Sequence, residues 1–421
     1  MLDIKLVREQ PDLVRSAAAN KNEKCDLDAI LALDGRRREI IRTVERLKAE
    51  RNQASADIAL KKKAGESADE AIAATRKLGD EIKVQDDLLR QVEADLQKLL
   101  EWLPNLPHES VPVGSDSEAN PVVRKWGTKP AKTFKVLPHW EIGEKLDILD
   151  LAAGASVSGS GFYVLRGLGA RLQRALVSYM LDLHTAAGFV EVSVPYIVNS
   201  NTMFGTGQLP KLAGDMYHVG EDDLWLIPTA EVPVTNLYKQ KILGDEDLPV
   251  YMVAHSPCFR REAGAAGKDT RGMIRVHQFD KVELVKIVHP EQSYKELESL
   301  AVQCEKVLQG LKLPYRVVTL CTGDLSFASA KTYDLELWAA GVEKYLEISS
   351  ISNFEAFQAR RMNLRYRNVE KKIDFPHTLN GSGLALARLI PAILENYQNP
   401  DGTVTIPDVL RPYMGGVERI G

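Results

Sequence analysis

The sequence has few of the features that mark secreted, membrane-spanning or metal-rich proteins. Its four cysteines stand far apart and form no C-x-x-C pair, which argues against a disulfide framework and against a cysteine-rich zinc site. No apolar run approaches the roughly 18 residues that a membrane-spanning helix needs, and the first residues lack the apolar core of a signal peptide. We therefore expect a cytoplasmic protein with no membrane partner.

Glycine-rich phosphate-binding motifs are also missing. Neither G-x-G-x-x-G nor G-x-x-x-x-G-K-[ST] occurs, which disfavours dinucleotide-binding and P-loop folds. The net charge of −4 does not by itself suggest a nucleic-acid partner, so any such binding must come from local patches. A chain of 421 residues is too long for one ordinary core, and we expect at least two domains.

Proline is absent from residues 27–103, where apolar residues recur at steps of three, four and seven. This spacing predicts two long helices that pack as an antiparallel coiled coil, on the order of 55 Å long at ~1.5 Å per residue. Residues 61–67 are expected to form the turn, with Ser67 and Glu70 as a capping box for the second helix. The predicted seam consists of Leu33, Ile40, Val44, Leu47, Ala54 and Ile58 in the first helix and Ile82, Leu89, Val92, Leu96, Leu99 and Leu103 in the second.

Charge is divided unevenly between these two helices. Residues 36–63 hold ten Lys/Arg against four Asp/Glu, and residues 66–101 hold five against ten. Opposite charges favour pairing of the helices, so the pattern fits a solvated coiled coil. It also fits an arm that binds RNA phosphates, and the lack of aromatic residues favours an RNA duplex over single-stranded bases. The basic candidates are Arg36, Arg37, Arg38, Arg42, Arg46, Lys48 and Arg51.

Prolines, glycine and serines over residues 104–119 predict a linker. We therefore predict a helical N-terminal domain over residues 1–108 and a larger domain over 120–421. In the larger domain several predicted strands follow one another without intervening helices, which indicates an α+β fold with a mostly antiparallel sheet flanked by helices. Strands are expected at 189–194, 224–227, 315–320, 333–338 and 345–351, and helices at 168–187, 290–310 and 383–396.

Two strand-forming runs within residues 250–288 predict a long antiparallel hairpin. The hairpin carries Arg260, Glu262, Arg275 and Glu283 among apolar residues, and such charges are costly to bury without a partner. The guanidinium fork matches phosphate oxygens, and carboxylates suit amines. The hairpin therefore predicts a site for a nucleoside triphosphate and an amino acid. Its strands are expected at 250–258 and 274–288, with the loop at 263–272.

Several segments resemble those of one enzyme family. The sequences FRRE at 259–262 and RVHQFDKVE at 275–283 resemble motif 2 of class II aminoacyl-tRNA synthetases, specifically of the seryl-tRNA synthetases. LNGSGLALAR at 379–388 resembles motif 3. The helix and strand that end at Pro195 resemble motif 1, which implies a homodimer, although they also fit an ordinary helix–strand unit. Other matching segments, in the family's order, are 206–210, 229–231, 347–350 and 410–414.

This resemblance implies a serine–tRNA ligase, in which the arm grips the long variable stem of serine tRNA. L-serine and ATP would form seryl-adenylate and pyrophosphate, and the seryl group would then pass to the 3′ end of serine tRNA, with selenocysteine tRNA as a second candidate. The attacking serine carboxylate is already ionised near neutral pH, so the chemistry requires no general base. The protein need only position the reactants and stabilise charge on the phosphates, with Mg²⁺ as the expected cofactor.

The resemblance also implies roles for individual residues. Arg260, Arg275 and Arg388 would be catalytic: Arg260 would span the α-phosphate and the serine carboxylate, Arg275 would hold the outer phosphates, and Arg388 would do so from the opposite side. Glu347 and Ser350 would ligate Mg²⁺. The ATP site would comprise Arg260, Arg261, Glu262, Val276, His277, Gln278, Phe279, Glu347, Ile348, Ser349, Ser350 and Arg388. The L-serine site would comprise Thr229, Ala230, Glu231, Arg260, Glu283, Asn380 and Ser382.

Other interpretations of these residues and of the function also fit the sequence. Arg388 also fits a surface position, Glu347 a solvent-facing strand position, and Phe279 a core position. Leu346 stands where seryl enzymes usually carry arginine, which predicts altered nucleotide affinity. A ligase that charges a carrier protein, an inactive synthetase body that binds nucleic acid, and a threonine or proline enzyme are alternatives. The long arm argues against the first, the full set of charged motif residues against the second, and the lack of a Cys/His cluster against a threonine enzyme.

Overall fold

The computed structural model describes residues 1–263 and 271–421. It contains two compact units. One comprises Met1–Ala19 and Glu23–Pro104, and the other comprises Asn20–Asn22 and Asn105–Gly421. Within the described part of the chain, no helix combines the length and apolarity that a membrane crossing requires.

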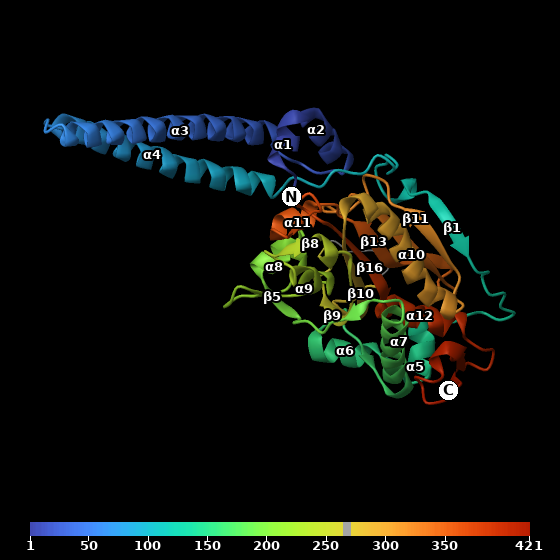
Figure 1. Cartoon of the computed structure of the whole chain (residues 1–421). Helices are drawn as coiled ribbons and strands as arrows, with labels where there is room; N and C mark the ends of the chain where they lie inside the picture. Colours follow the sequence, from blue (N-terminus) through green and yellow to red (C-terminus); the bar gives the residue numbers. More distant parts are fainter. Residues whose placement is uncertain (264–270) are drawn as a thin grey trace. The chain divides into compact units, whose positions relative to one another are not determined.

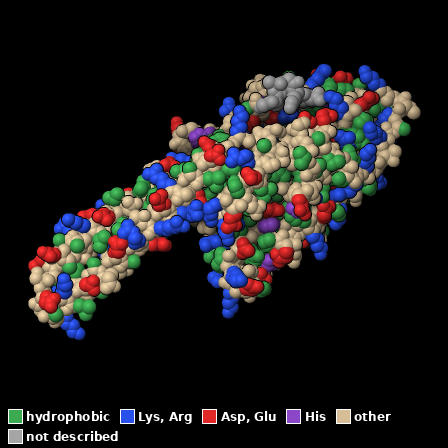
Figure 2. Space-filling view, turned by 90° about the horizontal axis from the view of Figure 1, so that it is seen from above, with side chains coloured by type: hydrophobic (Ala, Val, Ile, Leu, Met, Phe, Trp, Pro, Cys, Tyr) green, Lys and Arg blue, Asp and Glu red, His purple; other side chains and the backbone are tan. Residues whose placement is uncertain are grey.

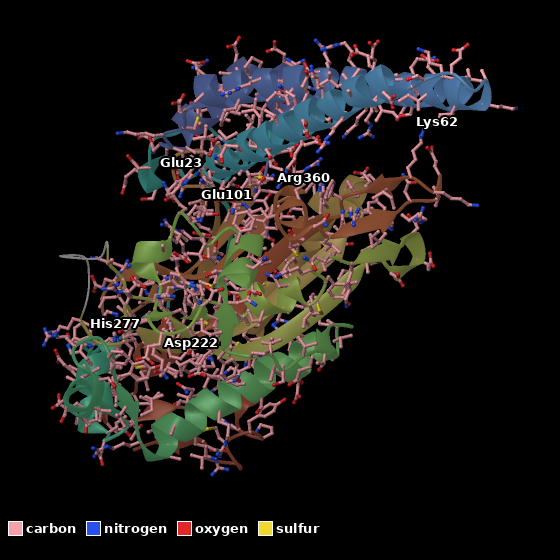
Figure 3. All side chains as sticks on the ribbon, turned by 90° about the vertical axis from the view of Figure 1, so that its left-hand side faces the viewer. Glu23, Lys62, Glu101, Asp222, His277 and Arg360 are labelled. Carbon is pink, nitrogen blue, oxygen red and sulfur yellow. The ribbon has the colours of Figure 1, made fainter. Side chains whose placement is uncertain are left out.

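The first unit is helical throughout, and its two long helices run side by side as an antiparallel hairpin (Figure 1). The predicted pair is confirmed. Lys62 lies in the last turn of the first long helix, at the far end of the hairpin (Figure 3). Two short helices that the sequence analysis did not predict precede the pair. The helices are α1 Ile4–Glu9, α2 Pro11–Asn20, α3 Leu27–Lys63 and α4 Asp69–Leu100.

The seam of the pair is apolar. Ile40 and Val44 of α3 pack with Val92 of α4 in one buried cluster, with Leu33 and Leu89 against it. Lys and Arg side chains are interspersed with Asp and Glu on the exposed surface of the pair (Figure 2). Across the flanks, Arg37 Nε lies 2.8 Å from Glu93 Oε1 and Lys48 Nζ lies 3.5 Å from Asp86 Oδ1. Opposite charges therefore do help the two helices pair, at two points.

The predicted capping box is wrong. Helix α4 begins at Asp69 after Ala68, so Ser67 is not the N-cap residue, and its Oγ accepts from the N–H of Asp69 at 3.5 Å. The Ser67 hydroxyl also donates to Asp69 Oδ2 at 3.0 Å, so Asp69, rather than Glu70, is the residue of the first turn that bonds Ser67. Asp69 and Glu70 then stabilise the positive end of the helix dipole without forming a box.

The second unit is built on one eight-stranded sheet with the strand order β1-β11-β12-β13-β16-β10-β9-β4. All neighbours are antiparallel except β4 and β9, so the mostly antiparallel sheet is as predicted. The strands are β1 Val122–Trp126, β4 Val190–Glu191, β9 Val250–Phe259, β10 Gln278–Val288, β11 Tyr315–Thr319, β12 Lys331–Ala339, β13 Lys344–Asn353 and β16 His377–Ala385.

Three helices pack against this sheet and form the main core with it. They are α7 Gly167–Thr185, α10 Ser293–Gly310 and α12 Leu386–Asn396. Residues alternate along β10: Val282 and Leu284 enter this core, whereas Phe279 and Lys281 line a cavity. The other helices of the unit are α5 His139–Lys145, α6 Leu151–Ser158, α8 Ser200–Gly205, α9 Glu231–Asn236 and α11 Phe357–Met362.

Some predicted bounds need correction. The helix expected at 383–396 begins only at Leu386, because residues 377–385 form the central strand β16. Strand propensity did not predict this strand, because Gly381 and Gly383 are residues that strands disfavour. The strand expected at 189–194 is only the two-residue β4, and β10 begins at Gln278 rather than at 274. Most of the loop expected at 263–272 lies outside the described residues.

Candidate active site

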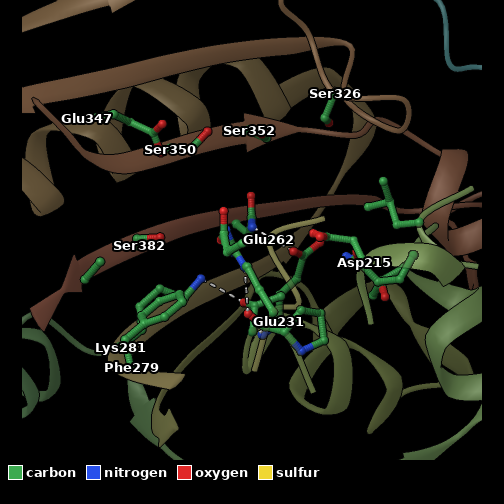
Figure 4. A pocket seen from close by; sticks show the side chains of 18 of the residues that line it. Asp215, Glu231, Glu262, Phe279, Lys281, Ser326, Glu347, Ser350, Ser352 and Ser382 are labelled. Carbon is green, nitrogen blue, oxygen red and sulfur yellow. Dashed lines mark hydrogen bonds between the residues drawn. The ribbon is translucent and has the colours of Figure 1, made fainter. Parts of the chain in front are cut away.

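A cavity of about 360 Å³ lies in the second unit, beside the central strands of the sheet. Strands β10, β13 and β16 each contribute residues to its wall, and along β10 these are Phe279 and Lys281, because every second side chain of a strand points to the same face. Serines of β13 and β16 lie above Glu231, Phe279 and Lys281 in Figure 4. The wall is therefore rich in polar and charged groups even though it is built on buried strands.

Three arginines from three different segments of the chain line this one cavity. Arg260 follows the end of β9, Arg275 precedes β10, and Arg388 lies in the first turn of α12. The guanidinium carbon of Arg260 lies 5.4 Å from the centre of the Phe279 ring. The three side chains give the cavity a concentration of cationic forks that suits a polyphosphate.

Two carboxylates hold two of these arginines. Arg275 Nη1 donates to Glu262 Oε2 at 2.7 Å, and Arg388 Nη1 lies 3.5 Å from Glu347 Oε2. Glu262 has a φ of 50°, in the left-handed region that non-glycine residues seldom adopt. Such backbone strain is most often kept where function requires the side chain in one place.

The other end of the cavity holds buried carboxylates. Glu231 begins α9 and is 5% exposed, and Gln358 Nε2 donates to its Oε1 at 2.7 Å. The amide of Asn380 bridges two acids, with Nδ2 2.9 Å from Glu231 Oε2 and 3.1 Å from Glu283 Oε1. Burial raises the pKa of Glu231 to about 7, and the negative charge of Glu283 adds to this rise.

Lys281 balances this negative charge, and it is not among the site residues predicted from the sequence. Its ammonium forms an ion pair with Glu283 and donates to Thr229 Oγ1 at 2.8 Å, although the residue is only 5% exposed. A signal for it was present, since Phe279, Lys281 and Glu283 stand two apart on one predicted strand. Gln358 was missed as well, and no motif in the sequence points to it.

Glu347 and Ser350 of β13 both line the cavity, beside Arg388. A carboxylate and a hydroxyl are hard oxygen ligands and fit Mg²⁺, which usually keeps several waters and binds substrate phosphates. Among the described residues, no group of three or more His, Cys, Asp and Glu side chains is arranged to hold a metal ion. A cation at this place therefore needs oxygens from a bound ligand as well.

Most of the residues assigned by resemblance line the cavity, and six do not. Glu283 is fully buried just behind Asn380, and Ala230 lies in a neighbouring apolar cluster. The hydroxyl of Ser349 donates to the Ser382 carbonyl at 2.6 Å. Imidazole Nδ1 of His277 lies 3.1 Å from the Arg260 carbonyl oxygen, which fits a structural role. The side chains of Arg261 and Gln278 are exposed. Leu346, which stands where seryl enzymes usually carry arginine, lies opposite Leu337 of β12.

Comparison with known proteins agrees with this geometry. The family model "tRNA synthetase class II core domain (G, H, P, S and T)" matches residues 216–397, and "Seryl-tRNA synthetase N-terminal domain" matches residues 1–107. The prolyl-tRNA synthetase of Giardia lamblia, solved with prolyl-adenylate, shares the fold at a TM-score of 0.57 and 15% identity, over 66% of this chain and 58% of its own. The antiparallel sheet, the arginine-lined cavity and the matched core domain define a class II aminoacyl-tRNA synthetase.

Proteins with higher sequence identity identify the family within this class. The chain is 57% identical to the serine–tRNA ligase of Carboxydothermus hydrogenoformans, over 100% of this chain and 99% of that protein. It is 55% identical to the serine–tRNA ligase of Desulfitobacterium hafniense, over the whole of both chains. The crystal structure of seryl-tRNA synthetase from Pyrococcus horikoshii complexed with ATP superposes with a TM-score of 0.94 at 38% identity, covering 100% of this chain and 99% of that one. The chain belongs to the seryl-tRNA synthetase family.

Proposed function

We propose that the protein is an ATP-dependent serine–tRNA ligase. It activates L-serine with ATP to seryl-adenylate and pyrophosphate, and it then transfers the seryl group to the 3′ end of serine tRNA. The observation that carries the proposal is the division of one cavity into a cationic end with three arginines and an anionic end with Glu231 and, behind it, Glu283. A triphosphate and an ammonium group can occupy these two ends at the same time.

At the cationic end, the arginines position ATP for in-line attack by the serine carboxylate. Arg260 lines the cavity near enough to Glu231 for its charge to act on that carboxylate, so it can hold both the α-phosphate and the carboxylate of serine. Arg275 and Arg388 bind the outer phosphates, and each exchanges its present carboxylate partner, Glu262 or Glu347, for phosphate oxygens. Glu262 is then released to meet the adenine amino edge, and Phe279 stacks on the ring. Fixed cations next to the departing pyrophosphate stabilise the charge that develops there.

At the anionic end, the polar groups select serine. Glu231, Thr229 and Asn380 provide partners for an ammonium group, and Glu283 adds its negative charge from behind Asn380. Ser382 Oγ lies 3.5 Å from Glu283 Oε2 beside them. A site that hydrogen-bonds a substrate hydroxyl rejects the analogue without one, because its own buried groups are left unpaired. Alanine is therefore rejected for lack of a hydroxyl, and threonine must be excluded by lack of room.

Magnesium completes the site in this proposal. Glu347 and Ser350 would hold the ion, which neutralises phosphate charge when it is bound. Arg388 lies next to Glu347, so the ion and the guanidinium would act on neighbouring phosphates.

The helical pair is the proposed tRNA-binding arm of a domain over residues 1–108, with the catalytic domain over 120–421 and a linker at 104–119. Arg36, Arg42 and Arg51 of α3 form no ion pair among the described residues, unlike Arg37, Arg38 and Arg46. Arginines without an internal partner are the best placed to bind RNA phosphates. Serine tRNA, with its long variable stem, is the proposed partner.

The protein is also proposed to act as a homodimer. Strand β4 lies at the edge of the sheet beyond β9, and it exposes Val190 by 62%. Leu237 and Ile242 are exposed by 42% and 47%. An exposed sheet edge with apolar side chains nearby is typical of a surface that another chain covers.

One pair of measurements tests the proposed function. Serine-dependent ATP–pyrophosphate exchange tests the first step, and aminoacylation of serine tRNA with and without residues 36–101 tests the second and the arm. We expect exchange in both proteins and loss of aminoacylation without the arm. Retained aminoacylation in the deleted protein would refute the role of the arm, and absence of exchange in the full chain would refute the proposed reaction.

A further inference from the structure

A histidine and a glutamate are completely buried beside the segment that leads into Arg275, and neither belongs to the site described above. His139 begins α5 and Glu395 lies in the last turn of α12, and both side chains are 0% exposed. His139 Nδ1 lies 2.9 Å from Glu395 Oε1. The same oxygen accepts from the backbone N–H of His139 at 3.0 Å, and Oε2 accepts from the backbone N–H of Gly341 at 2.9 Å. The buried carboxylate is thus fully hydrogen-bonded.

The other imidazole nitrogen contacts Met273, two residues before Arg275. Nε2 of His139 accepts from the backbone N–H of Met273 at 3.0 Å, so Nε2 carries no proton and Nδ1 is the donor to Glu395. Gly272 has a φ of 77°, and a Cβ placed there would lie 2.1 Å from His139 Nε2. Only glycine allows both this backbone conformation and this approach. The chain is therefore shaped to bring the imidazole onto Met273.

Helix α12 holds the next residue directly. Arg388 Nε lies 3.4 Å from the carbonyl oxygen of Ile274. Arg388 and Glu395 are seven residues apart, which places them on one face of the helix two turns from each other. Helix α12 therefore contacts two consecutive residues. Glu395 bonds His139, which in turn bonds Met273, and Arg388 bonds Ile274 directly. Arg275 follows immediately.

We propose that the buried His139–Glu395 pair is a positioning unit for ATP binding. It fixes the segment that leads into Arg275 relative to α12, so that Arg275 and Arg388 are set at the right separation for the outer phosphates before ATP arrives. The proposal rests on the assignment of this cavity to ATP. Small displacements of such groups are costly, because a shift of about 1 Å can reduce the rate by roughly 10²-fold.

Two substitutions separate positioning from mere packing. In His139→Asn the side-chain amide nitrogen takes the place of Nδ1, so it can still donate to Glu395, but Met273 loses its acceptor. In His139→Gln the amide oxygen takes the place of Nε2 and can still accept from Met273, while Glu395 loses its imidazole donor. His377→Asn is the matched control, because His377 Nδ1 bonds Ser293 Oγ at 2.8 Å and the residue does not line the cavity.

The readouts are the KM for ATP, the KM for serine and kcat in pyrophosphate exchange, together with the unfolding temperature of each variant. We expect His139→Asn to raise the KM for ATP by roughly 10- to 100-fold while the KM for serine changes by less than about threefold. We expect His139→Gln to retain an ATP KM near that of the unmodified protein, because the backbone N–H of residue 139 still bonds Glu395 and the amide oxygen still accepts from Met273. His377→Asn should lower the unfolding temperature without changing the KM for ATP.

Two outcomes would overturn the proposal: an unchanged ATP KM in His139→Asn, or equal effects on both substrates that follow the loss of thermal stability in both His139 variants. Failure of the proposed function gives a different result, since the unmodified protein would then show no serine-dependent exchange at all.

Discussion

Gln358 Nε2 donates a 2.7 Å hydrogen bond to Glu231 Oε1, and this contact joins helix α11 to the first residue of α9. Asn380 donates to the other oxygen of the same carboxylate at 2.9 Å. Thr378 Oγ1 in turn donates to Gln358 Oε1 at 2.7 Å. Glu231 is therefore held in one orientation before any ligand binds, which lowers the cost of ordering the site when serine arrives.

Removing this carboxylate gives the first prediction. Glu231→Ala leaves the amides of Gln358 and Asn380 without their acceptor and leaves the serine ammonium without its partner. We expect serine-dependent pyrophosphate exchange to fall by roughly three orders of magnitude or more, the scale seen when buried polar partners go unpaired. Glu45→Ala makes the same change at an exposed position of α3 and should leave exchange unchanged. Near-normal exchange in Glu231→Ala would remove the residue from the serine site.

The raised pKa of Glu231 gives the second prediction. With a pKa of about 7, Glu231 is mostly protonated at a pH near 6 and mostly ionised near 8. Only the ionised form attracts the serine ammonium, so serine binding should weaken as the pH falls through 7. Competition by one proton predicts that the serine KM at about pH 6 is about tenfold that at about pH 8.

The measurement is the serine KM in pyrophosphate exchange at saturating ATP across that pH range. Glu231→Gln serves as the control, because its amide does not titrate there and its serine KM, although higher, should stay flat. A serine KM in the unmodified protein that does not change between these two pH values would count against the assignment.

Periodicity and short motifs were enough to predict the helical pair and most of the motif residues around the cavity. The seam residues of α3 and α4 lie at heptad spacing. Arg260 and Arg275 stand out because charge is unusual among the apolar residues of a predicted hairpin. These signals are local, so they can be read along the chain.

The missed features depend on partners that are distant in sequence. Gln358 matters only because the fold brings it to Glu231, and His139 only because Met273 and Glu395 surround it. The strand β16 was missed because its stability comes from pairing with β10 and β13 on both sides rather than from its own glycine-containing sequence. No local pattern carries such information.

Lys281 gives the third prediction. It is the cation that balances Glu283, and Lys281→Met leaves that carboxylate buried without its ion pair. Breaking a buried pair in this way costs about 3–5 kcal/mol of stability. Glu283 is bonded to Asn380 of the serine site, so its unpaired charge should also displace Asn380, and we expect serine activation to fall by at least about 100-fold. The measurement is kcat/KM for serine, together with the unfolding temperature.

Lys286→Met provides the matched control for this prediction. Lys286 lies on the same strand, is 3% exposed, and pairs with Glu296 at 2.7 Å outside the cavity. It should lower thermal stability to a similar degree while the serine kcat/KM stays near normal. If both variants lose stability and activity in parallel, Lys281 is structural and has no special role in the serine site.

The arm gives the fourth prediction. Replacing Arg36, Arg42 and Arg51 by alanine removes three cations that have no ion-pair partner among the described residues. We expect pyrophosphate exchange to be unchanged, because the first step does not involve tRNA. The kcat/KM for serine tRNA should fall at least tenfold, and its dependence on log salt should become shallower by about two to three, since each lost phosphate contact removes about 0.7–0.9 from the slope.

The matched control replaces three other arginines of α3 whose guanidinium groups are already engaged. Those groups are paired with carboxylates of the arm itself, at distances of 2.6 to 3.3 Å, so they are less available to bind phosphates. Their removal should change the salt slope by less, even if the helical pair loses some stability. Equal slopes for the two triple variants would mean that net charge, rather than particular unpaired arginines, attracts the tRNA. The control residues are Arg37, Arg38 and Arg46, with Glu93, Asp34 and Glu50 as their partners.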